Sequence, residues 1–115
     1  MRHHNANRKF GRKRGQRSAL LKSLARSLIL HEAILTTESK AKELRPYVEK
    51  IVSNGKKETI ASRRLISAKI GASATQKLFS DLVPKYKNRK GGYLRVLRVG
   101  TKLSDGSVRS RIEFV

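Results

Sequence analysis

Hydrophobic residues recur at a helical spacing of 3.6 in four segments of the chain, 18–30, 38–54, 59–70 and 73–84. In the second segment the apolar stripe stays in phase across Pro46, although proline removes a backbone donor and crowds the preceding turn. We therefore expect one kinked helix there rather than two short ones. Its inward positions are Ala41, Leu44, Val48, Ile51 and Val52.

Capping residues and the apolar positions define the other helices. Ser18 is the expected N-cap of the first helix, and Thr37 or Ser39 that of the second. Ser73 with Gln76 three residues later matches a capping box for the fourth. In the third helix, the residues predicted to face the core are Ala61, Leu65 and Ala68.

Three further segments have the composition of strands: 33–37, 93–99 and 108–114. We interpret 93–99 as a buried strand from which Arg95 and Arg98 project. The last strand alternates apolar and charged residues, and a turn at 104–106 joins these two strands into a hairpin. The predicted order is α-β-α-α-α-β-β. The expected fold is α+β with two layers, a small three-stranded mixed sheet covered by helices on one face.

Residues 1–17 differ from the rest of the chain. They contain seven Lys and Arg residues and no carboxylate, and Phe10 is their one large apolar side chain. Such a segment buries too little apolar surface to offset the entropy cost of ordering. We expect an extended basic arm that is disordered without RNA, followed by a single globular domain over 18–115.

The formal net charge of +20 on 115 residues points to a polyanionic partner. Nucleic acid fits best, because Lys and Arg that neutralise phosphates release counterions. A membrane surface is the runner-up, although no apolar run is long enough to span a bilayer. The Arg-rich start also resembles an organellar transit peptide. The absence of cysteine excludes disulfides and thiolate metal sites.

Residues suited to catalysis or metal binding are sparse. His3 and His4 are adjacent but lack further ligands at zinc-binding spacing, and His31 lacks a second histidine four residues on. The eight carboxylates form no obvious acid–base pair. We therefore predict no enzyme activity, no metal, no cofactor and no small-molecule substrate.

Basic side chains occur in every segment, and the aromatic content of 5% argues against a stacking platform for single strands. This favours broad phosphate contact with folded RNA. Gly91 and Gly92 either allow a close approach to a phosphate or only turn the chain into the strand, and the two are compatible. The predicted RNA-binding residues are Arg2, His3, His4, Arg8, Lys9, Arg12, Lys13, Arg14, Arg17, Lys22, Arg26, Arg63, Arg64, Arg89, Lys90, Arg95 and Arg98.

Several motifs together resemble the bacterial ribosomal protein L-seventeen family along the whole chain. The most specific are His31-Glu32-Ala33-Ile34-Leu35-Thr36-Thr37, the Lys40–Arg45 run that follows it, and Arg89-Lys90-Gly91-Gly92-Tyr93-Leu94-Arg95. The resemblance implies a structural protein of the large ribosomal subunit, cytoplasmic rather than organellar, that binds large-subunit rRNA near the exit-tunnel side and contacts neighbouring ribosomal proteins.

Two hypotheses concern how the RNA is bound. In the first, the arm threads between rRNA helices. In the second, Arg95 and Arg98 join the 85–90 loop in a second RNA face. Two rival functions remain, a nucleoid-type DNA-binding protein and a small RNA-processing enzyme that uses His3, His4 or His31.

Overall fold

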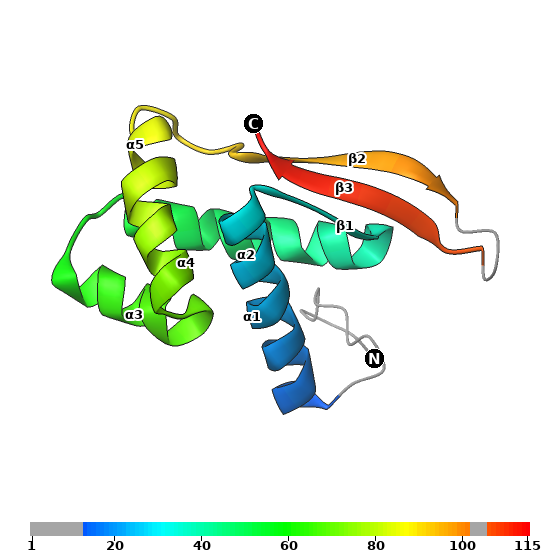
Figure 1. Cartoon of the computed structure of the whole chain (residues 1–115), viewed down its shortest axis with the longest axis horizontal. Coiled ribbons are helices and arrows are strands. Elements are labelled where there is room, and N and C mark those ends of the chain that lie inside the picture. The colour runs from blue at the N-terminus through cyan, green and yellow to red at the C-terminus, as the bar shows by residue number, and fades with distance from the viewer. Residues whose placement is uncertain (1–12, 102–105) are drawn as a thin grey trace, which may run out of the picture.

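Helices lie against one side of a three-stranded sheet in the computed structural model, which describes residues 13–101 and 106–115 (Figure 1). The elements are α1 Arg14–His31, β1 Ala33–Thr37, α2 Glu38–Gly55, α3 Ile60–Ile70, α4 Ala72–Lys77, η1 Leu78–Leu82, α5 Val83–Lys85, β2 Leu94–Thr101 and β3 Val108–Phe114. Since α4, η1 and α5 follow one another without a break, the predicted order and the α+β class are confirmed.

The sheet has the strand order β1-β3-β2 and is antiparallel throughout, so the predicted mixed sheet is wrong in this respect. The strands β1 and β2 run in the same direction, but β3 lies between them and hydrogen-bonds to both. Ile34 and Val96 both pair with Ile112. The hairpin places β3 in the centre, so no parallel pair forms.

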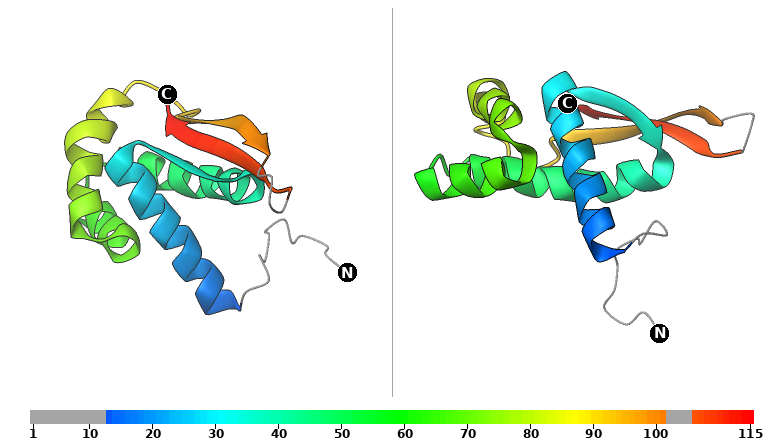
Figure 2. Two further views of the ribbon diagram at one scale, coloured as in Figure 1. Left: turned by 45° about the vertical axis from the view of Figure 1, so that its right-hand side comes forward. Right: turned by 60° about the horizontal axis from the view of Figure 1, so that its bottom comes forward.

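The helix α2 packs against all three strands (Figures 1 and 2). All five residues of its predicted stripe are buried, and the helix continues across the exposed Pro46, so the prediction of one helix rather than two is confirmed. Thr37 is its N-cap and accepts a hydrogen bond from the backbone N–H of Lys40 at 3.4 Å. This helix therefore joins the sheet to the other helices.

The first helix begins at Arg14, four residues before the predicted N-cap Ser18. Lys13 precedes it, and its backbone N–H donates to the side chain of Gln16 at 3.4 Å. The helix ends where Glu32 takes a left-handed conformation with φ of 64°. The carbonyl of Glu32 then accepts from the N–H of Phe114 at 3.0 Å, which ties the helix end to β3.

The sequence predicts the wrong inward face for α3. Ser62, Ile66 and Ile70 are buried, whereas Leu65 is 59% exposed. Two stripes compete in this segment, and the buried one carries two isoleucines, whereas Ala61 and Ala68 of the other are exposed like Leu65. The hydroxyl of Ser62 on the buried face donates to the carbonyl of Thr59 at 3.0 Å. A serine satisfied in this way can be buried at little cost.

The fourth helical segment differs from prediction in its start and in its interior. Gly71 precedes α4 and no side chain caps it, so the capping box predicted from Ser73 and Gln76 is absent. The π-helical turn η1 ends one residue before Val83 and Pro84. Proline crowds the carbonyl of the preceding turn, and a widened turn relieves that crowding. The run ends at Lys85, close to the predicted stop.

The far face of the sheet carries no helix among the described residues. Leu97 is 45% exposed and Val99 is 59% exposed, so the prediction of a buried strand at 93–99 holds for Tyr93 and Leu94 and is wrong for Leu97 and Val99. Only Leu94 of β2 is buried, because the helices cover the opposite face alone. The alternation predicted for β3 is confirmed, with Ser110, Ile112 and Phe114 buried.

Candidate nucleic-acid interface

The predicted basic residues of α1 and α3 lie on outward-facing surfaces of the helices. Lys13, Arg14, Lys22 and Arg26 are exposed and Arg17 is half-buried. The Nε of Arg26 comes to about 4.0 Å from where a Cβ on Gly71 would lie, so its side chain reaches the end of α3. The side chain of Arg26 therefore extends from α1 toward the end of α3.

On α3 the guanidinium of Arg63 lies 4.9 Å from the centre of the Phe79 ring, and Arg64 is exposed beside it. An arginine held over an aromatic ring keeps its charge and loses little freedom when it binds a phosphate. Neither arginine forms an ion pair with another described residue. Arg2, His3, His4, Arg8, Lys9 and Arg12 lie outside the described residues.

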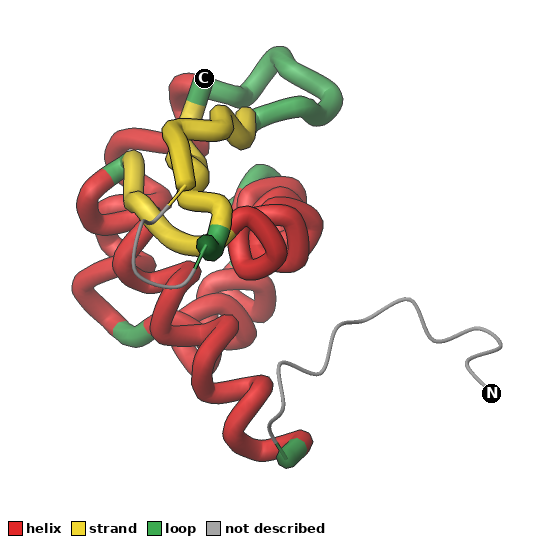
Figure 3. The backbone as a smooth tube through the Cα atoms, turned by 90° about the vertical axis from the view of Figure 1, so that its right-hand side faces the viewer, coloured by secondary structure: helices red, strands yellow, loops and turns green. Residues whose placement is uncertain are grey.

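The loop between α5 and β2, whose backbone path Figure 3 shows, exposes Arg89 and Lys90. The carbonyl of Arg89 accepts from the ammonium of Lys56 and from the hydroxyl of Tyr93, the latter at 3.1 Å. Lys56 also donates to the Tyr93 oxygen at 3.0 Å and holds the pKa of Tyr93 below its ordinary value. Lys56 therefore positions the loop from within the fold.

Arg95 and Arg98 cannot share one face with the loop as the second hypothesis requires. Arg95 pairs across the sheet with Glu113, and Arg98 pairs with Ser110. Side chains alternate between the two faces along a strand, so residues three positions apart, such as Arg95 and Arg98, point to opposite faces. Each arginine also forms an ion pair. Arg95 lies 2.9 Å from Glu113 and Arg98 lies 3.0 Å from Glu38. The Arg95 pair therefore links β2 to β3, and the Arg98 pair links β2 to α2.

These ion pairs predict how stability depends on pH. Hydrogen bonds from Arg95 and then Arg111 lower the pKa of Glu113, and those from Lys42 and Arg98 lower the pKa of Glu38, below 4.5. Their stabilisation is therefore complete above about pH 4.5 and is lost as the pH falls through the folded-state value. We expect the free energy of unfolding in urea to decrease below pH 4.5.

The variant Glu113→Gln isolates this effect. We expect its free energy of unfolding to fall less steeply between pH 4.5 and 3 than that of the wild type. Arg95→Gln removes one of the two partners of Glu113. The pH dependence of its free energy of unfolding should lie between those of the wild type and of Glu113→Gln. Identical pH profiles for all three proteins would contradict the role given to these pairs.

Sequence reasoning missed three lysines that line one hollow. Lys50 lies on α2, Lys57 follows that helix, and Lys69 lies on α3, and all three are exposed. Lys50, Ser53, Asn54 and Lys57 follow one another at helical spacing, a polar stripe that was present in the sequence. Lys69 could not have been added, because the packing of α3 beside α2 is a tertiary contact.

Among residues 13–101 and 106–115, no group of three or more His, Asp or Glu residues is arranged to hold a metal ion. No helix in these ranges is both long and apolar enough to cross a membrane. His31 is exposed at the end of α1.

Comparison with known proteins gives a consistent match. Residues 20–115 match the family described as Ribosomal protein L17. The chain belongs to this family. It is 47% identical over 116 aligned residues to the large ribosomal subunit protein bL17 of Gemmatimonas aurantiaca, covering 100% of this chain and 98% of the relative.

Two other bL17 proteins show similar agreement. That of Shouchella clausii is 46% identical over 93% of this chain and 97% of its own length. That of Novosphingobium aromaticivorans is 46% identical over 100% of this chain and 82% of its own length. The ribosomal L17 resemblance found in the sequence is therefore confirmed, and the match includes every element from α1 to β3.

Proposed function

We propose that this chain is a structural constituent of the large ribosomal subunit, where it binds large-subunit rRNA and contacts neighbouring ribosomal proteins. Its membership of the ribosomal L17 family is the observation that carries the proposal. The net charge of +20 and the exposed arginines of α1 and α3 support it. Ribosomes of the bacterial cytoplasm are the proposed location.

In this role, the arm and the outer face of α1 bridge phosphates of rRNA segments that repel one another. Arginine and lysine lower that repulsion, and the counterions that they displace favour binding. The arm then orders on the RNA and α1 continues it into the domain. Arg63, Arg64, Arg89 and Lys90 supply further phosphate contacts from the domain itself.

The family is structural and non-enzymatic, which argues against an RNA-processing enzyme that uses His3, His4 or His31. The DNA-binding rival is tested by competition. We expect the full chain, bound to a fluorescent large-subunit rRNA fragment, to be released at least tenfold more efficiently by unlabelled rRNA than by duplex DNA of equal phosphate content. Equal competition by the two polymers would contradict selective rRNA binding.

A further inference from the structure

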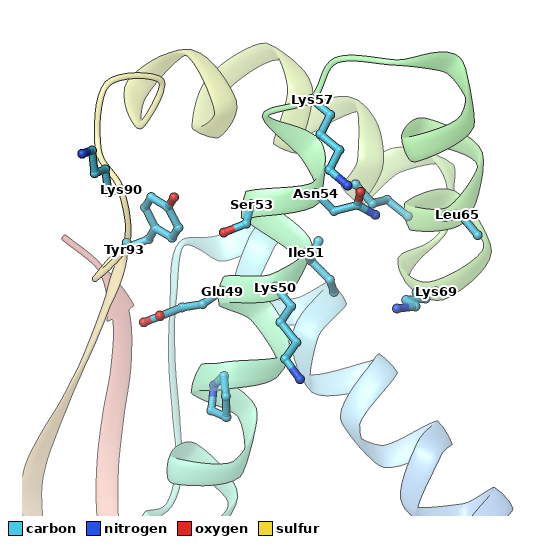
Figure 4. A pocket seen from close by; sticks show the side chains of 13 residues that line it. Glu49, Lys50, Ile51, Ser53, Asn54, Lys57, Leu65, Lys69, Lys90 and Tyr93 are labelled. Carbon is cyan, nitrogen blue, oxygen red and sulfur yellow. The ribbon is translucent and has the colours of Figure 1, made fainter.

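A hollow of about 620 Å³ lies over the outward side of α2, between α3 and the segment that leads into β2 (Figure 4). Its volume is within the roughly 300–1,000 Å³ of sites that hold small organic groups. Figure 4 shows Lys57, Asn54, Leu65 and Lys69 on the side of α2 that faces α3, with Lys50 below them. Three separate parts of the chain therefore contribute to one concave surface.

The hollow has an excess of positive charge that the protein itself does not balance. Glu49 is the one carboxylate among its described lining residues, and it lies 3.3 Å from Arg45 on the same helix. None of Lys50, Lys57 and Lys69 forms an ion pair with another described residue. Lys90 also lines the hollow, so it carries four ammonium groups, which repel one another until an anion neutralises them.

An exposed apolar side chain lies among these lysines. Leu65 is 59% exposed, and the buried Ile51 and Ile66 also line the hollow. A phosphate alone would gain nothing from the leucine, and a purely apolar ligand would gain nothing from the lysines. An unpaired nucleotide has both a flat base and charged phosphates. Asn54 beside them has an amide that can donate to and accept from a base edge.

We propose that this hollow binds an unpaired rRNA nucleotide, with its base against Leu65 and its flanking phosphates on Lys50, Lys57 and Lys69. The inference rests on the proposed rRNA binding and adds to it a site where the RNA chain is single-stranded. Side chains cannot read the deep major groove of an RNA duplex, whereas bases in loops and bulges can be extruded onto a protein surface. An acidic peptide is the competing occupant.

The test separates phosphate contact from base contact in the full chain, with protein-free bacterial large-subunit rRNA as the probe. We expect the combined Lys50→Gln, Lys57→Gln and Lys69→Gln variant to lower the logarithmic salt slope of binding by about 2, at about 0.7 for each single-stranded phosphate contact. We expect Leu65→Ala to weaken binding about tenfold with an unchanged slope, because it removes apolar contact and no charge.

A control with the same loss of charge replaces Lys40, Lys87 and Arg109 by Gln, none of which forms an ion pair with another described residue. These residues lie outside the hollow, so this control should change the slope by less than 1. A slope change equal to that of the lysine variant would overturn the inference. The three substituted lysines are exposed, so the variant should keep its fold, and its circular dichroism should match that of the wild type.

A photoreactive phenylalanine analogue at position 65 identifies the occupant directly. Cross-linking to an unpaired rRNA nucleotide in assembled subunits would support the inference. Cross-linking to a protein instead would overturn it and would leave the proposed function intact, provided that the wild type still binds rRNA. Failure of the wild-type chain to bind rRNA would overturn both.

Discussion

Deletion of residues 2–12 is expected to lower the logarithmic salt slope of rRNA binding by about 3 to 4, because four phosphate contacts at about 0.9 each are lost. The deleted segment contains Arg2, Arg8, Lys9 and Arg12. It ends before Lys13 because α1 begins at Arg14, so the helix and its first turn remain. Binding measured by filter retention at a series of salt concentrations gives the slope.

A full-length control separates charge from chain length. Replacing the same four basic residues by Gln should reproduce most of the change in slope while the arm is retained. An unchanged slope in both proteins would show that the arm does not contact phosphates. A change in the deletion alone would assign the effect to the backbone or to the histidines.

Tyr86→Ala is expected to lower the free energy of unfolding by about 3–5 kcal/mol, as truncation of a buried aromatic ring does. The ring is 2% exposed, and its centre lies 5.2 Å from that of Tyr93 and 6.1 Å from that of Phe114. Its hydroxyl donates to the carbonyl of Val115 at 2.6 Å. Tyr86 therefore joins the end of the helical run to the last strand and to the segment that precedes β2.

Two control variants separate the contribution of ring packing from that of the hydrogen bond. Tyr86→Phe keeps the ring and removes the hydrogen bond, and we expect it to cost about 1 kcal/mol. Phe79→Ala truncates a half-buried ring on the same helical run and should cost less than Tyr86→Ala. Urea unfolding at pH 7 gives the three values. Equal losses for Tyr86→Ala and Tyr86→Phe would contradict the packing role.

Most of the fold could be predicted from apolar spacing because its central helix has a single unambiguous stripe. Every expected inward residue of α2 is buried, and the alternation of β3 is as expected. Prediction failed where two apolar stripes compete for the core, as in α3. It also failed where tertiary contacts determine which residues are buried. The exposure of Leu97 and Val99 depends on the absence of a helix over that face among the described residues, which strand composition does not reveal.

The candidate interface was predictable in its composition but less so in its grouping. Arg14, Lys22 and Arg26 of α1 are exposed, and so are Arg63 and Arg64, as charge on helix faces predicts, whereas Arg17 is half-buried. The pairing of Arg95 with Glu113 and of Arg98 with Glu38 depends on strand register and on the position of α2. The lysines of the hollow come together only through the packing of α3 beside α2.

The central claim is that this chain is a component of the large ribosomal subunit held there by rRNA. Sedimentation of cell extracts with an affinity-tagged chain, followed by washing of the subunits at 0.5 M salt, tests it most directly. We predict that the wild-type chain stays with the large subunit in about one copy and that the chain lacking residues 2–12 is depleted by the wash. A wild-type chain found at the top of the gradient, away from both subunits, would contradict the account.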